Sequence, residues 1–472
     1  MVFSSIPFLF YFLPLFLASY YVLPTRNLVV LVASLLFYAW GEARYLPLLA
    51  VYILVNWAFG LLIGGNGRWR GWLLGGGVAI NLGLLIGCKY LAFLLVQLNA
   101  TGLLHLPVIA VALPLGISFF TFQGISYLVD IHRGTVTPQR NLLTFAMYKA
   151  MFPQLVAGPI VRYAQIAGRI DGRRISAWRI RTGMVMFLFG LAQKVLIADS
   201  VAGTADAVFA LPAAELTLAT AWTGALCYMV QILFDFAGYS NMAIGLGHMM
   251  GFSFPANFDR PYAAQSVTAF WRRWHMTLSA WFRDYLYIPL GGNRFGAVRT
   301  YLNLALVFLL CGLWHGAAWN FAAWGLWHGG FLVLERLGLA ALLAHLWRPL
   351  RHLYLLLVVL FGWVLFRADG IGHAFGYMAA MLGDTAGDPV LTPLAGVLPA
   401  SSLAALVAGA IICAVPWPRE RALRDGLRRW FAAGWAGGVA SLAVVVLALG
   451  LGGLSGVSLA AGTYSPFIYF RF

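Results

Sequence analysis

Charged residues are scarce in this sequence. Only 10% of the 472 residues are charged, and just 15 are Asp or Glu. A soluble protein of this length needs far more charge to cover its surface, so the composition excludes an ordinary soluble enzyme. Hydrophobic residues make up 62% of the chain, in apolar runs long enough to cross a bilayer. The sequence predicts an all-α polytopic membrane protein with a single integral membrane domain, residues 1–472.

Cysteine is also rare, and each cysteine is isolated in the sequence. The four cysteines lie singly in or beside apolar segments, at Cys88, Cys227, Cys311 and Cys413. None forms a CxxC pair, so neither a disulfide framework nor a thiolate metal site is indicated.

Acidic residues are outnumbered by the 31 Lys and Arg, which gives a net charge of +16. In a soluble protein this excess would suggest nucleic acid as a partner. Here the arginines cluster in short loops between apolar runs, which is the positive-inside pattern of membrane proteins. We therefore expect the lipid bilayer as the partner and no nucleic acid. The first apolar run has no basic residue before it and no small-residue cleavage site after it, so we expect an uncleaved first span.

Hydropathy predicts about ten to eleven transmembrane helices, together with re-entrant segments around a central catalytic cavity. The expected spans are 6–23, 28–43, 46–63, 73–98, 107–129, 183–201, 217–236, 353–366, 397–415 and 436–454. Basic residues fall in alternate loops, at Arg26, Arg68 and Arg70, then Arg133 and Arg140. These loops are expected in the cytoplasm, and both termini on the opposite side.

The loop 162–181 conflicts with simple alternation. It holds six arginines and one Asp, so it should be cytoplasmic, yet the apolar run 142–161 separates it from the previous cytoplasmic loop. Pro153 and the pair Gly158–Pro159 break a helix in that run. We expect the run to enter and leave on the same side, which requires burial in protein or a cavity. Loop 416–429, with five arginines, is also expected to be cytoplasmic.

Two Trp-His-Gly triplets interrupt the apolar stretch "CGLWHGAAWNFAAWGLWHGG" at 311–330. A helix over 301–314 would reach only about 21 Å, short of a bilayer core of about 30 Å. Gly312 and Gly316 are expected to loosen it. We therefore expect His315 at the tip of a second re-entrant segment.

Residues 267–287 are too charged to span but rich in aromatic side chains. Helical periodicity places four apolar side chains on one face with His275 beside them: Phe270, Trp274, Leu278 and Trp281. Arg272 and Arg273 fall on a more polar side. This pattern predicts a helix at the cytoplasmic interface that roofs the cavity.

An ionisable residue at membrane depth marks a functional site by default. His315 is the candidate general base, since a neutral imidazole titrates near physiological pH. The alternative is a structural imidazole bonded to a helix carbonyl. His275 is a candidate for a second polar group that faces the same cavity. For His328 the sequence favours a structural and a chemical role equally.

Other chemistries have weaker support in the sequence. The three histidines are 40 and 13 residues apart, unlike local ligand pairs, so no metal is expected. Asp235 reads as a buried acid, but no GxSxG elbow accompanies it, so a Ser-His-Asp triad is not indicated.

Several long blocks resemble the membrane-bound O-acyltransferases, in particular the bacterial alginate O-acetylase branch. They are "FDFAGYSNMAIGLGHMMGFSFPANF", "SVTAFWRRWHMTLSAWFRDYLYIPLGGNR", "CGLWHGAAWNFAAWGLWHG", "PLGISFFTFQGISYLVDIHRG", "FPQLVAGPIVRY" and the ending "SPFIYFRF". The resemblance implies a multi-pass enzyme of the bacterial inner membrane that moves acetyl from a cytoplasmic donor, acetyl-CoA, toward an exported polysaccharide. It implies catalytic roles for His315 and His275. Relatives commonly carry Asp where this chain has Asn241, which puts any role of a carboxylate there in doubt.

The family resemblance also implies partners: a periplasmic acetyltransferase and the polysaccharide export machinery. No permanently bound cofactor is expected. Interfacial arginines are candidates to bind the phosphates of the donor, namely Arg272, Arg273, Arg283 and Arg294. Simple positive-inside anchoring explains them equally well.

Alternatives remain open at this point. Cellulose acetylation, peptidoglycan O-acetylation and D-alanyl transfer are possible within the family. From the residues alone, a polymer or lipid transporter would suit the re-entrant segments equally well.

Overall fold

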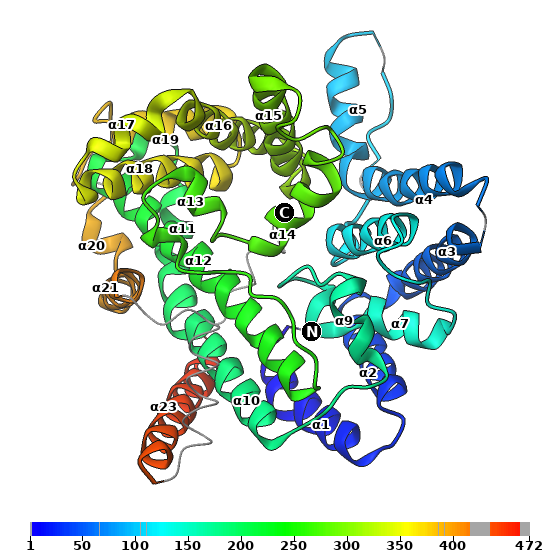
Figure 1. Cartoon of the computed structure of the whole chain (residues 1–472). Coiled ribbons are helices and arrows are strands. Elements are labelled where there is room, and N and C mark those ends of the chain that lie inside the picture. Colours follow the sequence, from blue (N-terminus) through cyan, green and yellow to red (C-terminus); the bar gives the residue numbers. More distant parts are fainter. Residues whose placement is uncertain are drawn as a thin grey trace. The chain divides into compact units, whose positions relative to one another are not determined.

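The computed structural model describes residues 2–65, 67–103, 105–109, 111–385, 387–390, 392–415 and 435–462. Every regular element in these ranges is a helix (Figure 1). Eight of the helical stretches are long and apolar enough to span a membrane, and Pro7–Val22 and Ala400–Ala414 are shorter apolar helices. The all-α, multi-pass class is therefore confirmed. The loop 416–429 and the ending 465–472 lie outside the described residues.

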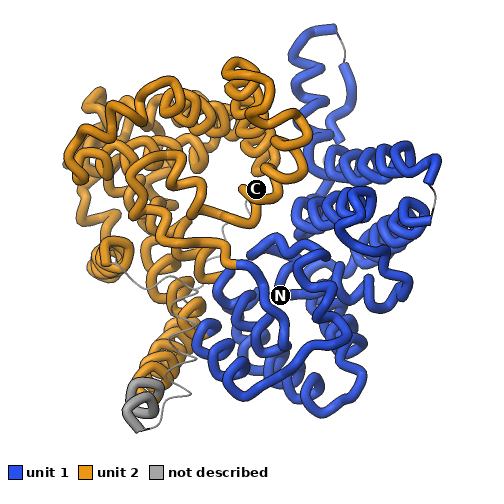
Figure 2. Tube along the Cα trace, in the orientation of Figure 1, with its two compact units in different colours: residues 1–187, 240–255 blue, residues 188–239, 256–472 orange. Residues whose placement is uncertain are grey.

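The chain forms two compact units, coloured separately in Figure 2. The expectation of a single domain over residues 1–472 stays a prediction. Unit 1 comprises residues 1–187 and 240–255. Its helices are α1 (Leu13–Val22), α2 (Arg26–Glu42), α3 (Leu46–Gly65), α4 (Arg70–Leu85), α5 (Leu91–Ala100), α6 (Ile117–His132), α7 (Leu142–Ala150), α8 (Phe152–Leu155), α9 (Tyr163–Ile170), the start of α10 (Ala177–Ala192) and the end of α12 (Leu218–Met249).

The expected span 107–129 is wrong at its start. Helix α6 begins only at Ile117, because Gly116 adopts a left-handed conformation with φ 75°. The preceding residues include Pro107 and Pro114, and prolines interrupt a helix. Hydropathy alone does not reveal this later helix start, because the residues between the two prolines are apolar.

The run 142–161 is broken as the sequence predicts. Helix α7 ends at Ala150, α8 occupies only four residues, and the chain then continues without a helix to Arg162. Neighbouring groups satisfy the interrupted backbone: Phe152 N donates to Ser34 Oγ at 3.1 Å, and Tyr148 Oη donates to Val161 O at 3.1 Å. Residues 147–161, which include the break, are all buried in unit 1, and burial in protein is the condition for irregular backbone at membrane depth.

Unit 2 comprises residues 188–239 and 256–472. After the end of α10 and the π-helical segment η4 (Gln193–Ala198) it contains α11 (Asp199–Phe209), the start of α12, α13 (Val267–Trp271), α14 (Met276–Phe282), η7 (Arg283–Tyr287), α15 (Gly296–His315), α16 (Trp319–Leu334), η8 (Glu335–Leu339), α17 (Ala340–His345), α18 (Arg348–Arg367), α19 (Ile371–Met381), α20 (Leu394–Val397), α21 (Ala400–Ala414) and α23 (Trp435–Ala460).

Two expectations for unit 2 need correction. Helix α15 has 20 residues, because it begins at Gly296 and continues through Gly312 to His315. At 1.5 Å per residue it is about 30 Å long, so the premise that it is too short to span is wrong. The continuous helix expected over 267–287 is also wrong, since the chain turns between α13 and α14, and His275 takes a left-handed conformation there (φ 40°, ψ 54°). The four apolar side chains of its expected face are nonetheless all buried.

Candidate active site

Helices α15 and α16 form a hairpin with His315 at its tip. The chain leaves the helical conformation at Gly316 and resumes it at Trp319. The two helices pack closely because glycines line the contact: a Cβ on Gly312 would overlap the carbonyl oxygen of Phe321, and one on Gly325 would overlap that of Phe308. The expectation that His315 lies at the tip of a re-entrant segment stays a prediction, and the structure places His315 at the turn between two helices that are each long enough to span a membrane. Gly312 serves the packing and does not loosen the helix.

Aromatic rings surround His315. Its ring centroid lies 4.8 Å from that of Trp314, 5.2 Å from Trp324 and 5.1 Å from Phe366, all edge-on. Only 5% of the residue is exposed. The imidazole thus packs within an apolar pocket of aromatic rings.

His275 lies at the turn between α13 and α14 and is 1% exposed. Its Nδ1 is 3.0 Å from Asn257 Oδ1, and its ring centroid is 4.6 Å from that of Phe236. Burial lowers the pKa of His275 to about 3, so the ring is neutral at physiological pH.

One tryptophan connects the two candidate histidines. The ring of Trp314 lies 6.5 Å from His275 and 4.8 Å from His315, measured between centroids. The structure therefore brings His275 and His315 to the same aromatic cluster in unit 2, although they are 40 residues apart in the sequence.

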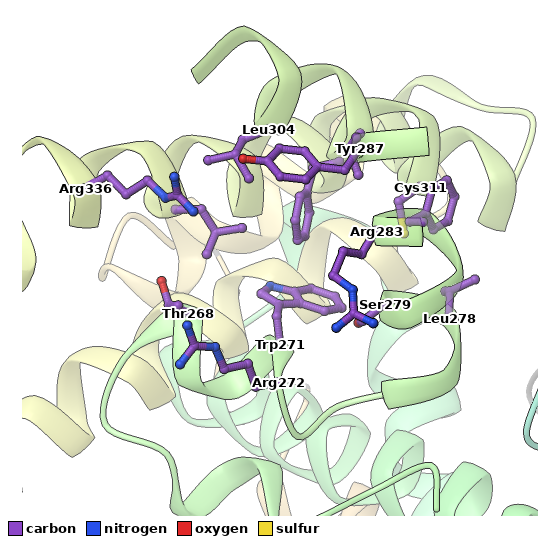
Figure 3. Close-up of a pocket in the computed structure, with 14 residues that line it drawn as sticks. Thr268, Trp271, Arg272, Leu278, Ser279, Arg283, Tyr287, Leu304, Cys311 and Arg336 are labelled. Carbon is purple, nitrogen blue, oxygen red and sulfur yellow. The ribbon is translucent and has the colours of Figure 1, made fainter. Parts of the chain in front are cut away.

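Unit 2 also contains a cavity of about 250 Å³, whose lining residues are drawn in Figure 3. Three guanidinium groups line it, those of Arg272, Arg283 and Arg336. Its other lining residues are mostly apolar and include Trp271 and Cys311, the latter one helical turn before His315. A concave apolar site with a few fixed cations suits a ligand with an anionic part and an apolar part.

The four arginines expected at a donor site divide into two pairs. Arg272 and Arg283 line the cavity, and Arg283 is also paired with Asp284 at 2.7 Å. Arg273 and Arg294 do not line it. Arg336, which was not expected at a donor site from the sequence, lines the cavity from η8, directly after α16.

His328 is fully buried one turn after Trp324 on α16. Its ring lies 5.1 Å from Trp271 and 5.2 Å from Trp324, between centroids. Within the described residues neither ring nitrogen has a hydrogen-bond partner. Trp324 thus separates His328 from His315, which favours a packing role for His328.

A buried ion cluster lies elsewhere in unit 2. Lys194 forms ion pairs with Asp199 and with Asp235, the latter at 3.0 Å, and all three side chains are at most 3% exposed. The prediction that Asp235 is buried is confirmed. The sequence offered a signal for the cluster, since a lysine and an aspartate each interrupt an apolar run. Asn241 follows Asp235 on α12 and is partly exposed.

Glu335 is a further residue that the sequence reading missed. Its carboxylate accepts hydrogen bonds from Val267 N at 2.6 Å, from Thr268 N at 2.9 Å and from Thr268 Oγ1 at 2.6 Å. It therefore caps the first turn of α13, the helix that carries Trp271 and leads into Arg272. Among the described residues there is no group of three or more His, Cys, Asp or Glu that could hold a metal ion.

Comparison with known proteins places the site within a family. Residues 138–371 match the sequence profile of the membrane-bound O-acyltransferase family, and this range contains His275 and His315. The chain is 41% identical to a probable alginate O-acetylase AlgI of Azotobacter vinelandii over the whole of both chains. It is 45% identical to the Pseudomonas aeruginosa protein of that name, over 81% of this chain and 75% of the relative. A peptidoglycan O-acetyltransferase of Helicobacter pylori is 36% identical over 81% and 80%.

Proposed function

Because the chain belongs to the membrane-bound O-acyltransferase family, it is an O-acyltransferase, and we propose that it passes acetyl groups from a cytoplasmic donor across the bacterial inner membrane to an exported polysaccharide of the alginate type. The observation that carries the proposal is the position of His315. It ends α15 in an apolar pocket, one turn beyond a residue that lines a cavity with three arginines. Family membership favours this activity over transport without chemistry.

His315 acts as the general base in this proposal. Its neutral imidazole takes the proton from the acceptor hydroxyl as that oxygen attacks the acyl carbonyl of the thioester. The tetrahedral adduct then collapses with cleavage of the C–S bond, and the departing thiolate takes the proton from the imidazolium. Such a base contributes typically about 10²–10⁴-fold to the rate. His275 contacts the same aromatic cluster and orients a substrate group.

The arginine cavity is the proposed site for the donor. Acetyl-CoA carries phosphates at one end and a thioester at the other. Guanidinium groups match phosphate oxygens, and Arg272, Arg283 and Arg336 supply three of them. Cys311 lines the cavity and lies one helical turn before His315, and the proposal places the thioester end of the donor on this side.

The acceptor is assigned from the names of the relatives. Full-length similarity to probable alginate O-acetylases supports alginate, and the peptidoglycan O-acetyltransferase supports the wider class of exported glycans. Cellulose acetylation and D-alanyl transfer remain second candidates. We expect a periplasmic acetyltransferase to complete transfer to the sugar, in contact with the export machinery.

Labelled acetyl-CoA offered to the purified protein in nanodiscs tests the activity. Thioester cleavage with acetyl transfer supports the proposal, and binding without cleavage contradicts it. The acetyl content of the secreted polymer with and without the gene tests the acceptor. Unchanged acetylation of alginate in the deleted strain would exclude alginate.

A further inference from the structure

Asn257 contacts the turn that carries His275. It lies between α12 and α13, and its side chain is buried. Its Oδ1 lies 3.0 Å from Nδ1 of His275, 2.8 Å from Oγ1 of Thr277 and 3.3 Å from N of Thr277. One atom of Asn257 thus meets three polar groups of the turn.

The direction of these hydrogen bonds follows from their chemistry. A backbone N–H only donates, so the Asn257 atom that faces Thr277 is the carbonyl oxygen and not the amide nitrogen. A carbonyl oxygen only accepts. Nδ1 of His275 therefore carries a proton and donates it to Asn257. In a neutral imidazole the lone pair then lies on Nε2.

The backbone keeps this arrangement in place. His275 has a left-handed conformation that is unfavourable for a residue with a side chain. Two main-chain hydrogen bonds hold the turn against the segment of Asn257: Met276 N donates to Asn257 O at 2.9 Å, and Asp259 N donates to Arg273 O at 2.9 Å. The ring of Phe236 packs edge-on against the imidazole. These hydrogen bonds and the contact with Phe236 together hold the turn in its strained conformation.

We propose that Asn257 is a positioning residue that holds His275 in the tautomer protonated at Nδ1, so that Nε2 accepts a hydrogen bond from the hydroxyl of the acyl acceptor. The inference rests on the proposed function, in which the ring of His275 contacts the reacting acceptor. Burial keeps the ring neutral, so Nε2 carries a lone pair and no proton in this tautomer. Nε2 in this tautomer has no proton to give, so His275 recognises a hydrogen-bond donor and does not stabilise the oxyanion.

The tautomer is measurable without turnover. Full-length protein with ¹⁵N-labelled histidine is prepared in nanodiscs, and the His275 signals are assigned by comparison with His275→Gln. The wild type is expected to show a protonated Nδ1 and an unprotonated Nε2 near pH 7. In Asn257→Leu the ring is expected to lose the Nδ1 proton from a substantial fraction of molecules. Asn303→Leu is the matched control, because Asn303 is also buried but donates to the carbonyls of Leu290 and Gly292.

Kinetics test the role of the lone pair, with acetyl-CoA as the donor and the purified periplasmic acetyltransferase partner as the immediate acceptor. Asn257→Leu is expected to raise KM for the acceptor about tenfold, equivalent to one hydrogen bond, and to leave KM for acetyl-CoA unchanged. In Asn257→Asp the carboxylate still accepts from Nδ1 but raises the pKa of the imidazole. Its activity is expected to be restored at high pH, with the acid limb of the pH profile at higher pH than in the wild type.

Two results would overturn the inference. One is a wild-type ring protonated at Nε2. The other is an altered tautomer in Asn257→Leu with an unchanged KM for the acceptor. Failure of the proposed function has a different signature, namely no acetyl transfer by the wild type although the ring is protonated at Nδ1.

Discussion

His315 and His275 have different immediate surroundings. His315 packs edge-on against the rings of Trp314, Trp324 and Phe366, whereas His275 donates a hydrogen bond from Nδ1 to Asn257 Oδ1. A tautomer fixed by this hydrogen bond suits a group that orients a substrate. The contact with Asn257 therefore supports an orienting role for His275 beside His315, the proposed base.

The cavity arginines give a prediction for donor binding. Arg272→Ala is expected to raise KM for acetyl-CoA about tenfold or more, because it removes a charge-assisted hydrogen bond to phosphate. Arg273→Ala is expected to raise it less, since that side chain does not line the cavity. Initial rates at several donor concentrations measure the difference. If both substitutions raised KM equally, the result would contradict donor binding by Arg272 and would support a role of these arginines in membrane anchoring alone.

Removal of metal ions is expected to leave the rate unchanged. The proposed chemistry uses an imidazole base and no metal. Treatment of the purified enzyme with EDTA, followed by an acetyl-transfer assay, checks this. Inhibition that added zinc reverses would make the histidines ligands and contradict the role of His315.

At the scale of elements, α13 depends on a contact from far along the chain. Glu335, 68 residues later, accepts both backbone N–H groups at its start. The segments on either side of the turn at His275 are short, with five residues in α13 and seven in α14. Helices of this length are marginal by themselves, so their geometry depends on Glu335 and Asn257.

This dependence gives a prediction for Glu335→Gln. Loss of the charged acceptor is expected to cost about 2 kcal/mol of stability and to raise KM for acetyl-CoA, because Thr268 and Arg272 line the cavity. Thermal unfolding and donor kinetics measure the two effects. Tyr354→Phe is the matched control, since it removes one hydroxyl donor to Glu335 at 3.2 Å and leaves the cap intact. A change in stability with no change in KM would show that capping of α13 by Glu335 does not affect donor binding in the cavity, and would contradict this prediction.

Local properties of the sequence were predictable and distant pairings were not. The apolar runs and the helix break at Pro153 and Gly158–Pro159 depend on neighbouring residues, so hydropathy and the proline pattern indicate them, although the starts of α6 and α15 were missed. The turn at His275 depends on Asn257, 18 residues earlier, and no periodicity reveals that contact. Arg336 reaches the cavity only because α15 and α16 fold into a hairpin. His315 and His275 are candidate residues from the sequence because an imidazole among apolar residues is conspicuous.

At the scale of the whole molecule, the topology depends on where the basic loops lie. Gly172 is exposed in the loop 162–181, and nothing crowds a side chain added there. Gly172→Cys is therefore expected to fold normally. It should resist an impermeant maleimide in intact cells and react after permeabilisation, because the loop is predicted to be cytoplasmic. Arg44→Cys, in the exposed segment between α2 and α3, is the control expected to react from outside. Labelling of Gly172→Cys but not of Arg44→Cys in intact cells would show that the topology is the opposite of the predicted one.

The central claim is that His315 is the base of an acyl transfer, and His315→Gln tests it most directly. Glutamine retains a hydrogen-bonding side chain but cannot act as a base. Transfer of labelled acetyl from acetyl-CoA is measured with the purified variant in nanodiscs, beside its thermal unfolding. The account predicts a rate lower by about 10²–10⁴-fold with unfolding close to that of the wild type. Retention of most of the activity would show that the imidazole only holds the hairpin tip, and would contradict the account.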